Sequence, residues 1–443
     1  MEFLCKPCRV RYSQEDLKEE EPEVCFVCLG LLQQDSSLNQ KIIAKLKEEN
    51  YDCKSASIQL SIPANISVRE RVASDFFTKK PVKNVKESLK SLLEKNFVLP
   101  CWPMGDLKVI LDFESVDTEL DCTFLAAHAT KKMKIKNRKT KHSHISRNQV
   151  EHALASLSTD DLAKHFPWPP RKATEKASLA SIQFDRDPLL LAGCYVKNNR
   201  TTSQSPWFMD GKRFGTGSVS EFIEAVAIKA CEAKEARFSS AGREDIDVLM
   251  KGNGRPFLLS ILNAKKFYSI SAGDIENAIN ASTQDIQVLK VCWVSPLAAK
   301  HLKAGEETKE KTYRCIVYSR KELPNLDLIN QLDTPFVIQQ KTPIRVLHRR
   351  ANLTRPKSIL SIKAEFLSEQ ELAERSIPKS EQFQYFSLEL ETQAGTYVKE
   401  FVHGDLGRTF PSLSSIMSDF MDILELDVLS VELEWPVHAI INT

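Results

Sequence analysis

The sequence predicts an α+β protein whose larger part is built on a mixed β-sheet. From about residue 178 onward strand-like segments predominate. Some of them follow one another through short connections and others are separated by helices, a pattern typical of a mixed sheet rather than a doubly wound parallel one. The chain has 443 residues, which is too long for one ordinary hydrophobic core. Two or three domains are therefore expected.

The sequence pattern up to about residue 129 predicts that the N-terminal part forms a smaller α/β module. Residues 38–50 carry Ile42, Ile43 and Leu46 at helical spacing, and the alternating run SASIQLSIP that follows favours a strand. Further helices are expected from Ser67 and over VKESLKSLLEKNF, and further strands over LKVILDF and DCTFLAAHA. Prolines on both sides of Trp168 then indicate a linker or a domain boundary.

The C-terminal part is expected to begin with an apolar strand, LLLAGCYV, and the helix VSEFIEAVAIKACEAK. More strands are predicted over IQVLKVCWV, YRCIVYSR, SILSIKAEFL and FQYFSLELETQAGTYVKEFV. In the last of these, Gly395 precedes an alternating stretch that would point Tyr397 and Lys399 to the same face of a strand. A helix near PSLSSIMSDFMDIL and a strand over LDVLSVELEW follow.

The composition excludes some classes of protein. Hydrophobic residues make up 42% and charged residues 27% of the chain, and no apolar run approaches the roughly 18 to 20 residues that a membrane span needs. The first residues do not resemble a secretory signal, so the expected location is intracellular, in the nucleus or the cytoplasm. A net charge of +2 argues against a uniformly basic surface for nucleic acid, but it does not exclude local basic patches.

The cysteines suggest a metal site. Cys5 and Cys8 form one CxxC pair and Cys25 and Cys28 a second, with 16 residues between the pairs. Two such pairs can present four thiolates to one tetrahedral ion, so a structural Zn²⁺ is expected here, with four buried free thiols as the alternative. Because four sulfur ligands leave no position for water, this zinc should have no catalytic role. The other cysteines stand singly, and they are interpreted as core residues.

Three charged segments remain ambiguous when the residues are considered alone. The turn-like run from Gly242 to Asp247 could be a solvated turn or could carry a catalytic carboxylate. Residues 131–141 contain seven Lys or Arg and no acid, among them Lys136, Arg138 and Lys139. A soluble loop and a phosphate-binding loop explain this block equally well. The basic run over residues 345–357, with Arg345, Arg349 and Arg350, is a further candidate for contacts with RNA phosphates.

Many separate runs, taken together, resemble one family. SAGREDIDV, GNGRPF, KTYRCIV, TPIRVLHRR, TQAGTYVKEFVHGDLGRT and LELDVLSVELEWP are similar to the catalytic domain of the archaeal and eukaryotic Pus10 family of tRNA pseudouridine synthases. CFVCLGLLQ and the SVRE segment are similar to the zinc-bearing, THUMP-containing accessory domain of the same family. The runs cover nearly the whole chain and keep the family's order, which makes the match more specific than any single motif.

The resemblance implies a domain plan, an activity and a partner. It implies a zinc-binding segment over residues 1–40, a THUMP-containing RNA-binding domain over 41–170 and a pseudouridine synthase domain with a mixed sheet over 176–443. The implied activity converts uridine to pseudouridine at position 54, position 55 or both of the tRNA T-loop, without a catalytic cofactor. The implied partner is tRNA. A monomer is expected, because RNA supplies the large partner surface, and no membrane partner is expected from the composition. An RNA-binding adaptor that keeps the fold without turnover, and a zinc-dependent transcription factor, are the competing hypotheses.

The resemblance also assigns roles to residues. The aspartate of the GRxD-like turn, which acts as the nucleophile in this superfamily, falls on Asp245, and Asp247 is the less favoured candidate. Tyr313 is expected to stack against the target uracil, Tyr397 to line the pocket, and Lys399 to be the basic partner of the nucleophile. Arg243, in the same turn as Asp245, is expected to bind the substrate.

Overall fold

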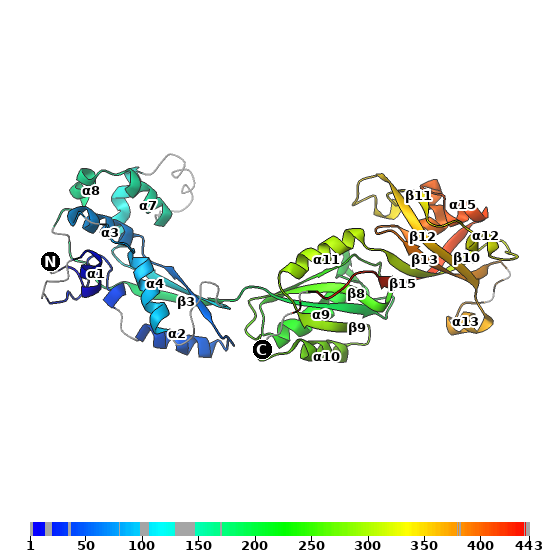
Figure 1. Cartoon of the computed structure of the whole chain (residues 1–443), viewed down its shortest axis with the longest axis horizontal. Coiled ribbons are helices and arrows are strands. Elements are labelled where there is room, and N and C mark those ends of the chain that lie inside the picture. The colour runs from blue at the N-terminus through cyan, green and yellow to red at the C-terminus, as the bar shows by residue number, and fades with distance from the viewer. Residues whose placement is uncertain are drawn as a thin grey trace. The chain divides into compact units, whose positions relative to one another are not determined.

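The computed structural model describes residues 3–13, 20–33, 37–78, 80–97, 106–128, 147–168, 171–378, 380, 382–437 and 439. The chain divides into two compact units, Met1–Asp187 and Pro188–Thr443 (Figure 1). The sequence places the start of the second domain at residue 176, whereas the strand β3 (Ser178–Asp185) pairs with β2 (Leu107–Glu114) and so belongs to unit 1. Among the described residues, no helix is both long and apolar enough to cross a membrane.

Unit 1 is a small α/β layer structure. Its sheet has the order β1-β2-β3, with β1 (Ala56–Ser61) parallel and β3 antiparallel to β2. Along β2, residues 107, 109, 111 and 113 are buried, as expected for a strand with one face on a core. The helices of this unit are α1 (Lys6–Arg11), α2 (Ser37–Glu48), α3 (Asn65–Phe76), α4 (Val85–Asn96), α5 (Thr118–Cys122), α7 (Arg147–Ser156) and α8 (Thr159–His165), with 3-10 turns η1 (Leu31–Gln33) and η2 (Thr123–His128).

One strand predicted in unit 1 is wrong. The described part of DCTFLAAHA, residues 121–128, lies in α5 and η2, not in a strand. Its buried apolar residues, Cys122 and Leu125, are three positions apart, which matches a helical period and not the period of two of a strand. In addition, the hydroxyl of Thr123 donates to the carbonyl of Glu119 one turn earlier.

A buried arginine ties α3 to its surroundings. The Arg69 side chain is fully buried, and its Nε donates to Asp121 Oδ2 at 2.7 Å while Asp117 Oδ2 lies 3.6 Å from Nη2. The Nη1 group donates to the carbonyl of Phe26, which lies between Cys25 and Cys28. Arg69 therefore connects α3, α5 and the second CxxC pair.

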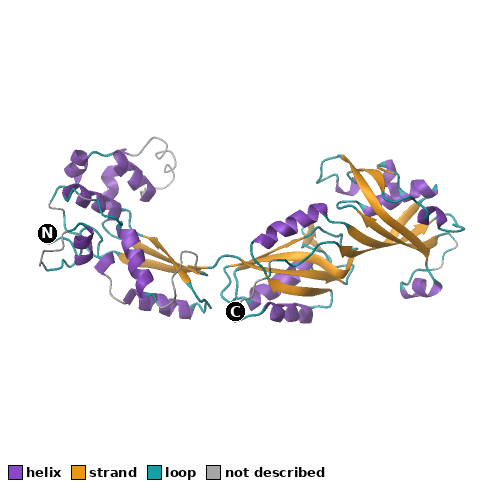
Figure 2. Cartoon of the chain, in the orientation of Figure 1, coloured by secondary structure: helices purple, strands orange, loops and turns teal. Residues whose placement is uncertain are grey.

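Unit 2 is organised around one large mixed sheet (Figure 2). The strand order is β14-β11-β12-β13-β10-β15-β8-β4-β9, with β7 also paired to β8. Within this described sheet β15 and β8 are parallel, whereas the other pairs are antiparallel. The predicted α+β class with a mixed sheet is confirmed. The strands are β4 (Leu189–Lys197), β7 (Glu235–Ser240), β8 (Leu249–Leu262), β9 (Ile286–Trp293), β10 (Lys311–Ser319), β11 (Phe336–Lys341), β12 (Thr354–Phe366), β13 (Gln384–Thr392), β14 (Thr409–Phe410) and β15 (Met421–Val431).

Helices cover both faces of one half of this sheet. The helices α9 (Val219–Ala230) and α10 (Ala272–Ser282) lie on one face and α11 (Leu297–Thr308) on the other (Figure 1). Neighbouring residues of β4 divide between two cores as a strand requires: Leu191 belongs to the larger core and Ala192 to the core beneath α11. Trp435 is a buried member of that second core, and its indole N–H donates to the carbonyl of Gly193 at 2.8 Å.

Short elements complete unit 2. They are the hairpin β5 (Trp207–Met209) and β6 (Lys212–Phe214), the helices α12 (Asp327–Asn330), α13 (Glu369–Glu374), α14 (Val398–His403) and α15 (Leu413–Met417), and the 3-10 turns η3 (Ile344–Val346) and η4 (Gly404–Gly407). The helix predicted near PSLSSIMSDFMDIL is shorter than expected. It ends because Ser418 adopts a left-handed conformation with φ of 51°, and β15 begins at Met421.

Removal of the Arg69 guanidinium should destabilise unit 1. The substitution Arg69→Leu leaves two buried carboxylates without their shared cation, and we expect a loss on the order of 3 kcal/mol in the free energy of unfolding. This expected loss of stability is at the lower end of the range for a broken buried ion pair, because the Arg171 side chain still lies 3.0 Å from Asp121. Hydrogen exchange of the full-length chain, resolved by peptide, measures the loss. Arg71→Leu on the same helix is the control, because Arg71 is partly exposed and pairs with Asp75 one turn away, besides donating to the carbonyl of Leu154. An equal loss in both variants would contradict the assignment.

Candidate active site

Unit 2 contains a cavity of about 320 Å³ that several distant segments line. Asp245, Arg243, Tyr313, Tyr397 and Lys399 all contribute to its wall, as do Arg345, Arg349 and Arg350 of the basic run. The structure therefore brings together the eight residues of unit 2 that were named for substrate or RNA, whereas Arg355 and Lys357, at the end of the basic run, do not line the cavity. Asp247 is not among the residues that line this cavity.

Asp245 lies on a tight turn between β7 and β8. Gly242 begins this turn with φ of 87°, a conformation that side chains rarely adopt. A Cβ atom there would lie 3.0 Å from Arg255 Nη1, so the glycine also lets the arginine approach the backbone. That same Nη1 group donates to the carbonyl of Ala241 at 2.9 Å.

A buried polar network lies behind the turn. The Glu244 carboxylate accepts the hydroxyl of Tyr195 at 2.8 Å and lies 2.8 Å from Arg255 Nε. Gln204 donates to the Tyr195 oxygen and to the carbonyl of Gly242, both through Nε2. Burial, reinforced by the Glu244 charge, raises the pKa of Tyr195, so its hydroxyl keeps the proton that it donates. The network fixes the residue that immediately precedes Asp245.

Lys197, at the end of β4, holds the same turn from another side. Its side chain is fully buried, and its ammonium group donates to the carbonyls of Thr202 at 2.8 Å, Ile246 at 2.7 Å and Asp245 at 3.3 Å. Burial lowers the pKa of Lys197 to about 8, although the nearby carboxylates of Glu244 and Asp247 favour the charged form. No role was predicted for Lys197, Tyr195 or Arg255, although Arg255 lies within the run GNGRPF.

Two cations approach the Asp245 carboxylate. Arg345 Nη1 lies 2.9 Å and Lys399 Nζ 3.6 Å from Asp245 Oδ2. Lys399 lies closer to Asp247, at 2.7 Å, so its charge is shared between the two aspartates. Although burial raises the pKa of Asp247, the bond from Lys399 lowers it overall. Asp247 is also the more exposed of the two side chains, at 60% against 39% for Asp245.

Two tyrosines face the cavity from different elements. Tyr313 lies on β10, packs against the main core, and has its pKa raised to about 12 by burial, with the Arg255 charge opposing. Tyr397 precedes α14, so the strand predicted to carry Tyr397 and Lys399 is wrong. Gly395, with φ of 74°, turns the chain after β13, and Gln340 binds both the N–H and the carbonyl of Tyr397. Lys399 therefore reaches the cavity from a helix.

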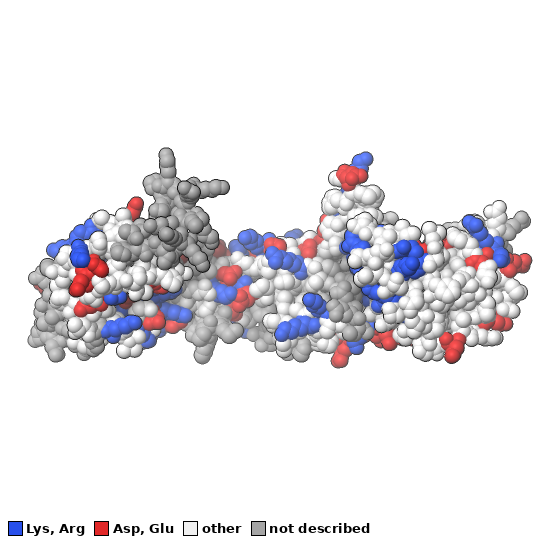
Figure 3. Space-filling view, turned by 90° about the horizontal axis from the view of Figure 1, so that it is seen from above, with Lys and Arg blue, Asp and Glu red and all other residues white. Residues whose placement is uncertain are grey.

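The predicted basic segments have different outcomes. Arg349 and Arg350 follow η3 and line the cavity. Lys136, Arg138 and Lys139 lie outside the described residues. On the face that Figure 3 displays, Lys and Arg patches alternate with Asp and Glu, which is consistent with the net charge of +2 and with no uniform basic coat.

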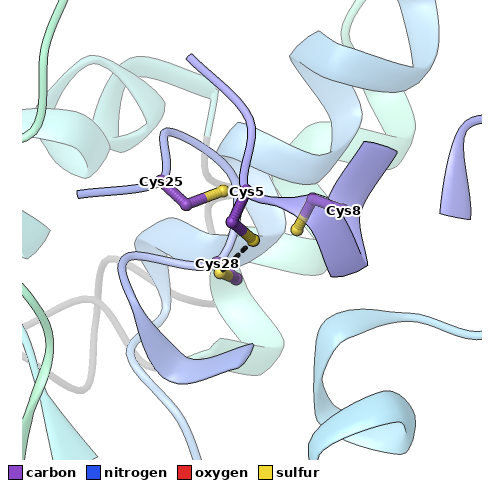
Figure 4. Close-up of side chains that lie close together, drawn as sticks. All are labelled: Cys5, Cys8, Cys25 and Cys28. Atoms are coloured by element: carbon purple, nitrogen blue, oxygen red, sulfur yellow. Dashed lines mark hydrogen bonds between the residues drawn. The ribbon is translucent and has the colours of Figure 1, made fainter. Parts of the chain in front are cut away.

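The four N-terminal cysteines form a second candidate site, in unit 1. The sulfur atoms of Cys5, Cys8, Cys25 and Cys28 are all buried and lie within 4.8 Å of one another (Figure 4). The sulfurs of Cys5 and Cys28 are 3.7 Å apart. Four sulfurs at about 2.3 Å from one zinc ion in a tetrahedron are separated by about 3.8 Å. The cluster therefore fits a metal ion of that kind.

Lys197 should make stability depend on pH in a defined window. In the unfolded chain its pKa returns to 10.5 from about 8, so between these values the unfolded state binds more protons than the folded state. The free energy of unfolding should therefore gain a contribution that increases with pH from about 8 to 10.5. Comparing urea unfolding of unit 2 in the wild type and in Lys197→Met isolates this contribution. Lys229→Met, at an exposed position on α9, is the control and should leave the pH dependence unchanged. A pH dependence that is identical in all three proteins would contradict the effect.

Comparisons with known proteins identify the family. A family model described as "Pus10, C-terminal" matches residues 190–432, and one described as "Eukaryotic Pus10, N-terminal" matches residues 25–184. The chain is 34% identical to "tRNA pseudouridine synthase Pus10" of Mus musculus, over 96% of this chain and 82% of that protein. It is 35% identical to the protein of the same name from Thermofilum pendens, over 58% of this chain and 55% of that protein. A solved "Cbf5-Nop10-Gar1 Complex" aligns with 54% of this chain and 48% of that one, at 12% identity and a TM-score of 0.26, which is too low to establish a shared fold. Because one family model spans more than half of the chain and the mouse relative aligns over nearly all of it, this chain belongs to the Pus10 family.

Proposed function

We propose that this chain is a tRNA pseudouridine synthase that isomerises one or both modifiable uridines of the T-loop, with Asp245 as the nucleophile. The names of its relatives support the activity. The observation that best supports the nucleophile is the position of Asp245, whose carboxylate lies beside Arg345 and Lys399 in a cavity that two tyrosines also line. An ionised carboxylate is the reactive form, and adjacent cations stabilise that form.

The cavity suits a nucleotide that has left its base stack. Its volume of about 320 Å³ is at the lower end of the range for small-molecule sites, about 300 to 1,000 Å³. A base that leaves its stack loses contacts with its neighbours, and aromatic side chains can replace them. Tyr313 and Tyr397 are the residues proposed to do so, with Arg243 as an additional contact to the substrate.

The reaction requires no oxidation or group donor. The bond between N1 of uracil and C1' of the ribose breaks, the base rotates, and a bond from C5 to C1' forms, while the proton lost from C5 is balanced by one gained at N1. Asp245 acts on the nucleotide. Lys399 and Arg345 stabilise the negative charge of the Asp245 carboxylate, and the turn that begins at Gly242 holds Asp245 in place. No catalytic cofactor is proposed.

Unit 1 is proposed to recognise RNA and to contain a structural zinc ion. The match to the N-terminal family model supports a THUMP-containing accessory domain, and the four clustered cysteines support Zn²⁺ as a closed tetrahedral site. Arg349 and Arg350, together with Lys136, Arg138 and Lys139, are proposed to contact tRNA phosphates. We propose that the protein acts as a monomer on tRNA, in the nucleus or the cytoplasm.

Asp245→Asn tests the nucleophile. The change keeps the size of the side chain and removes its charge, so we expect pseudouridine formation in unmodified tRNA to be abolished while tRNA binding persists. Mapping pseudouridine at single-nucleotide resolution measures the product and identifies the uridine. Asp247→Asn is the matched control and should reduce the rate only mildly, since Asp247 lies outside the cavity lining. An active Asp245→Asn protein would exclude Asp245 as the nucleophile, and an inactive wild type would favour the RNA-binding adaptor.

The zinc site predicts a metal content. Full-length protein purified under reducing conditions should contain about one zinc ion per chain, as measured by elemental mass spectrometry. Cys25→Ser should lose the metal and should accelerate hydrogen exchange in unit 1 without affecting unit 2. Cys53→Ser is the control, because Cys53 lies outside the cluster. A wild-type protein without zinc, or a Cys25→Ser protein that retains it, would contradict the site.

A further inference from the structure

We propose that Arg345 is a positioning residue for the Asp245 carboxylate, and that the buried carboxylate of Glu400 holds Arg345 in place. The inference rests on the proposed function, because it assigns a role in the reaction of Asp245. It gives Arg345 a different task from the phosphate contact that the basic run suggested.

The first argument is that Lys399 alone does not hold Asp245. Its ammonium group lies 2.7 Å from Asp247 and 3.6 Å from Asp245, so the shorter bond is to the neighbouring aspartate. Arg345 Nη1, at 2.9 Å, makes the hydrogen bond to Asp245 that Lys399 does not make. Without Arg345, the Asp245 carboxylate would have only a shared and more distant cation.

The second argument is the geometry of the guanidinium group. Nη1 of Arg345 donates to Asp245 while Nε donates to Glu400 Oε1 at 2.7 Å. A guanidinium group has five N–H donors in a rigid planar fork, so one arginine can bind two carboxylates in fixed directions, which a single ammonium group does less well. The face of Tyr397 lies 5.9 Å from the guanidinium carbon and limits its motion on another side.

The third argument is that Glu400 requires a cation. Its side chain is 2% exposed, and its Oε2 atom has no hydrogen-bond partner among the described residues. A buried charge without a partner is strongly destabilising, so Glu400 restrains Arg345 far more than the half-exposed Asp245 can. Glu400 follows Lys399 in α14. This one helix therefore carries Lys399 and, through Glu400, binds Arg345, the other cation that approaches Asp245.

The backbone of Arg345 is restrained as well. The N–H of Ile344, in the same 3-10 turn, donates to Asp405 Oδ2 at 3.2 Å. Arg408 donates to the carbonyl of Thr342 at 2.7 Å, just before this turn. Arg345 therefore projects from a fixed loop, and the direction in which it holds Asp245 is fixed with it.

The test separates reaction rate from binding. We expect Arg345→Met to lower the single-turnover rate, measured at saturating enzyme, on the order of 100-fold. A displacement of the reacting group by about 1 Å has an effect of that size. The affinity for unmodified tRNA should be unchanged. Arg314→Met removes an arginine that pairs with Glu371 away from the cavity, and it should match the wild type.

A double variant distinguishes positioning from simple neutralisation of Glu400. In Arg345→Met/Glu400→Gln no buried charge is left unpaired, so stability should return towards that of the wild type while the rate stays low. Recovery of the rate would overturn the proposal, because Arg345 would then serve only to neutralise Glu400. A normal maximal rate in Arg345→Met with weaker tRNA binding and a smaller salt dependence would also overturn it, in favour of a phosphate contact. An active wild type with an active Arg345→Met protein refutes this inference alone, whereas a wild type that makes no pseudouridine refutes the proposed function and this inference with it.

Discussion

The ion pair between Glu244 and Arg255 is the constraint on which the geometry of the active site depends. Both side chains are almost fully buried, so each requires the other, and Tyr195 adds a hydrogen bond to the same carboxylate. Because Glu244 is the residue before Asp245, the pair fixes the direction in which the chain presents the next carboxylate. Gly242 allows Arg255 to come close to the turn, and Lys197 binds the carbonyl groups that follow. Asp245, the proposed nucleophile, therefore stands on a turn whose other polar groups are already occupied, so that little rearrangement would be needed before reaction.

Arginine has a recurring use in this protein that its sequence does not reveal. Arg69 joins Asp121 to a backbone carbonyl, Arg255 joins Glu244 to another, and Arg345 joins Asp245 to Glu400. Arg69 and Arg345 connect chain segments that are far apart in sequence, whereas Arg255 binds two groups of the turn that precedes its own strand. A count of basic residues would assign all three to an RNA-binding surface. Only the burial of the acidic partners reveals which arginines bind carboxylates inside the protein and are not available to RNA.

Sequence reasoning reached the parts of the structure that leave a local or a motif-level signal. The mixed sheet follows from the arrangement of strands and connections, the cysteine cluster from the spacing of two pairs, and Asp245, Tyr313, Tyr397 and Lys399 from motif resemblance. The strand predicted through Tyr397 failed because the left-handed turn at Gly395 interrupts a pattern that looks alternating. Lys197 and Glu400 were missed because their partners at the site lie 48 to 55 positions away. Arg255 was missed because its partner Glu244 lies across a turn, and no local periodicity records either kind of contact. A lysine at the end of an apolar strand is expected to face solvent, yet Lys197 is fully buried.

The position of β15 has a consequence for synthesis of the chain. This strand is formed by residues 421–431, yet it lies in the middle of the large sheet, between β10 and β8, and Leu426 and Val428 form part of the cavity wall. While the ribosome is still adding residues before 421, β8 and β10 each have an edge without its final partner. Unpaired edges of this kind can associate with other chains. Joining distant segments late is also slow, since non-local strand pairing must first overcome the entropy of closing long loops. The nascent protein therefore has a divided sheet and an incomplete cavity until residue 431 has emerged, and its catalytic centre can assemble only after translation of unit 2 is nearly finished.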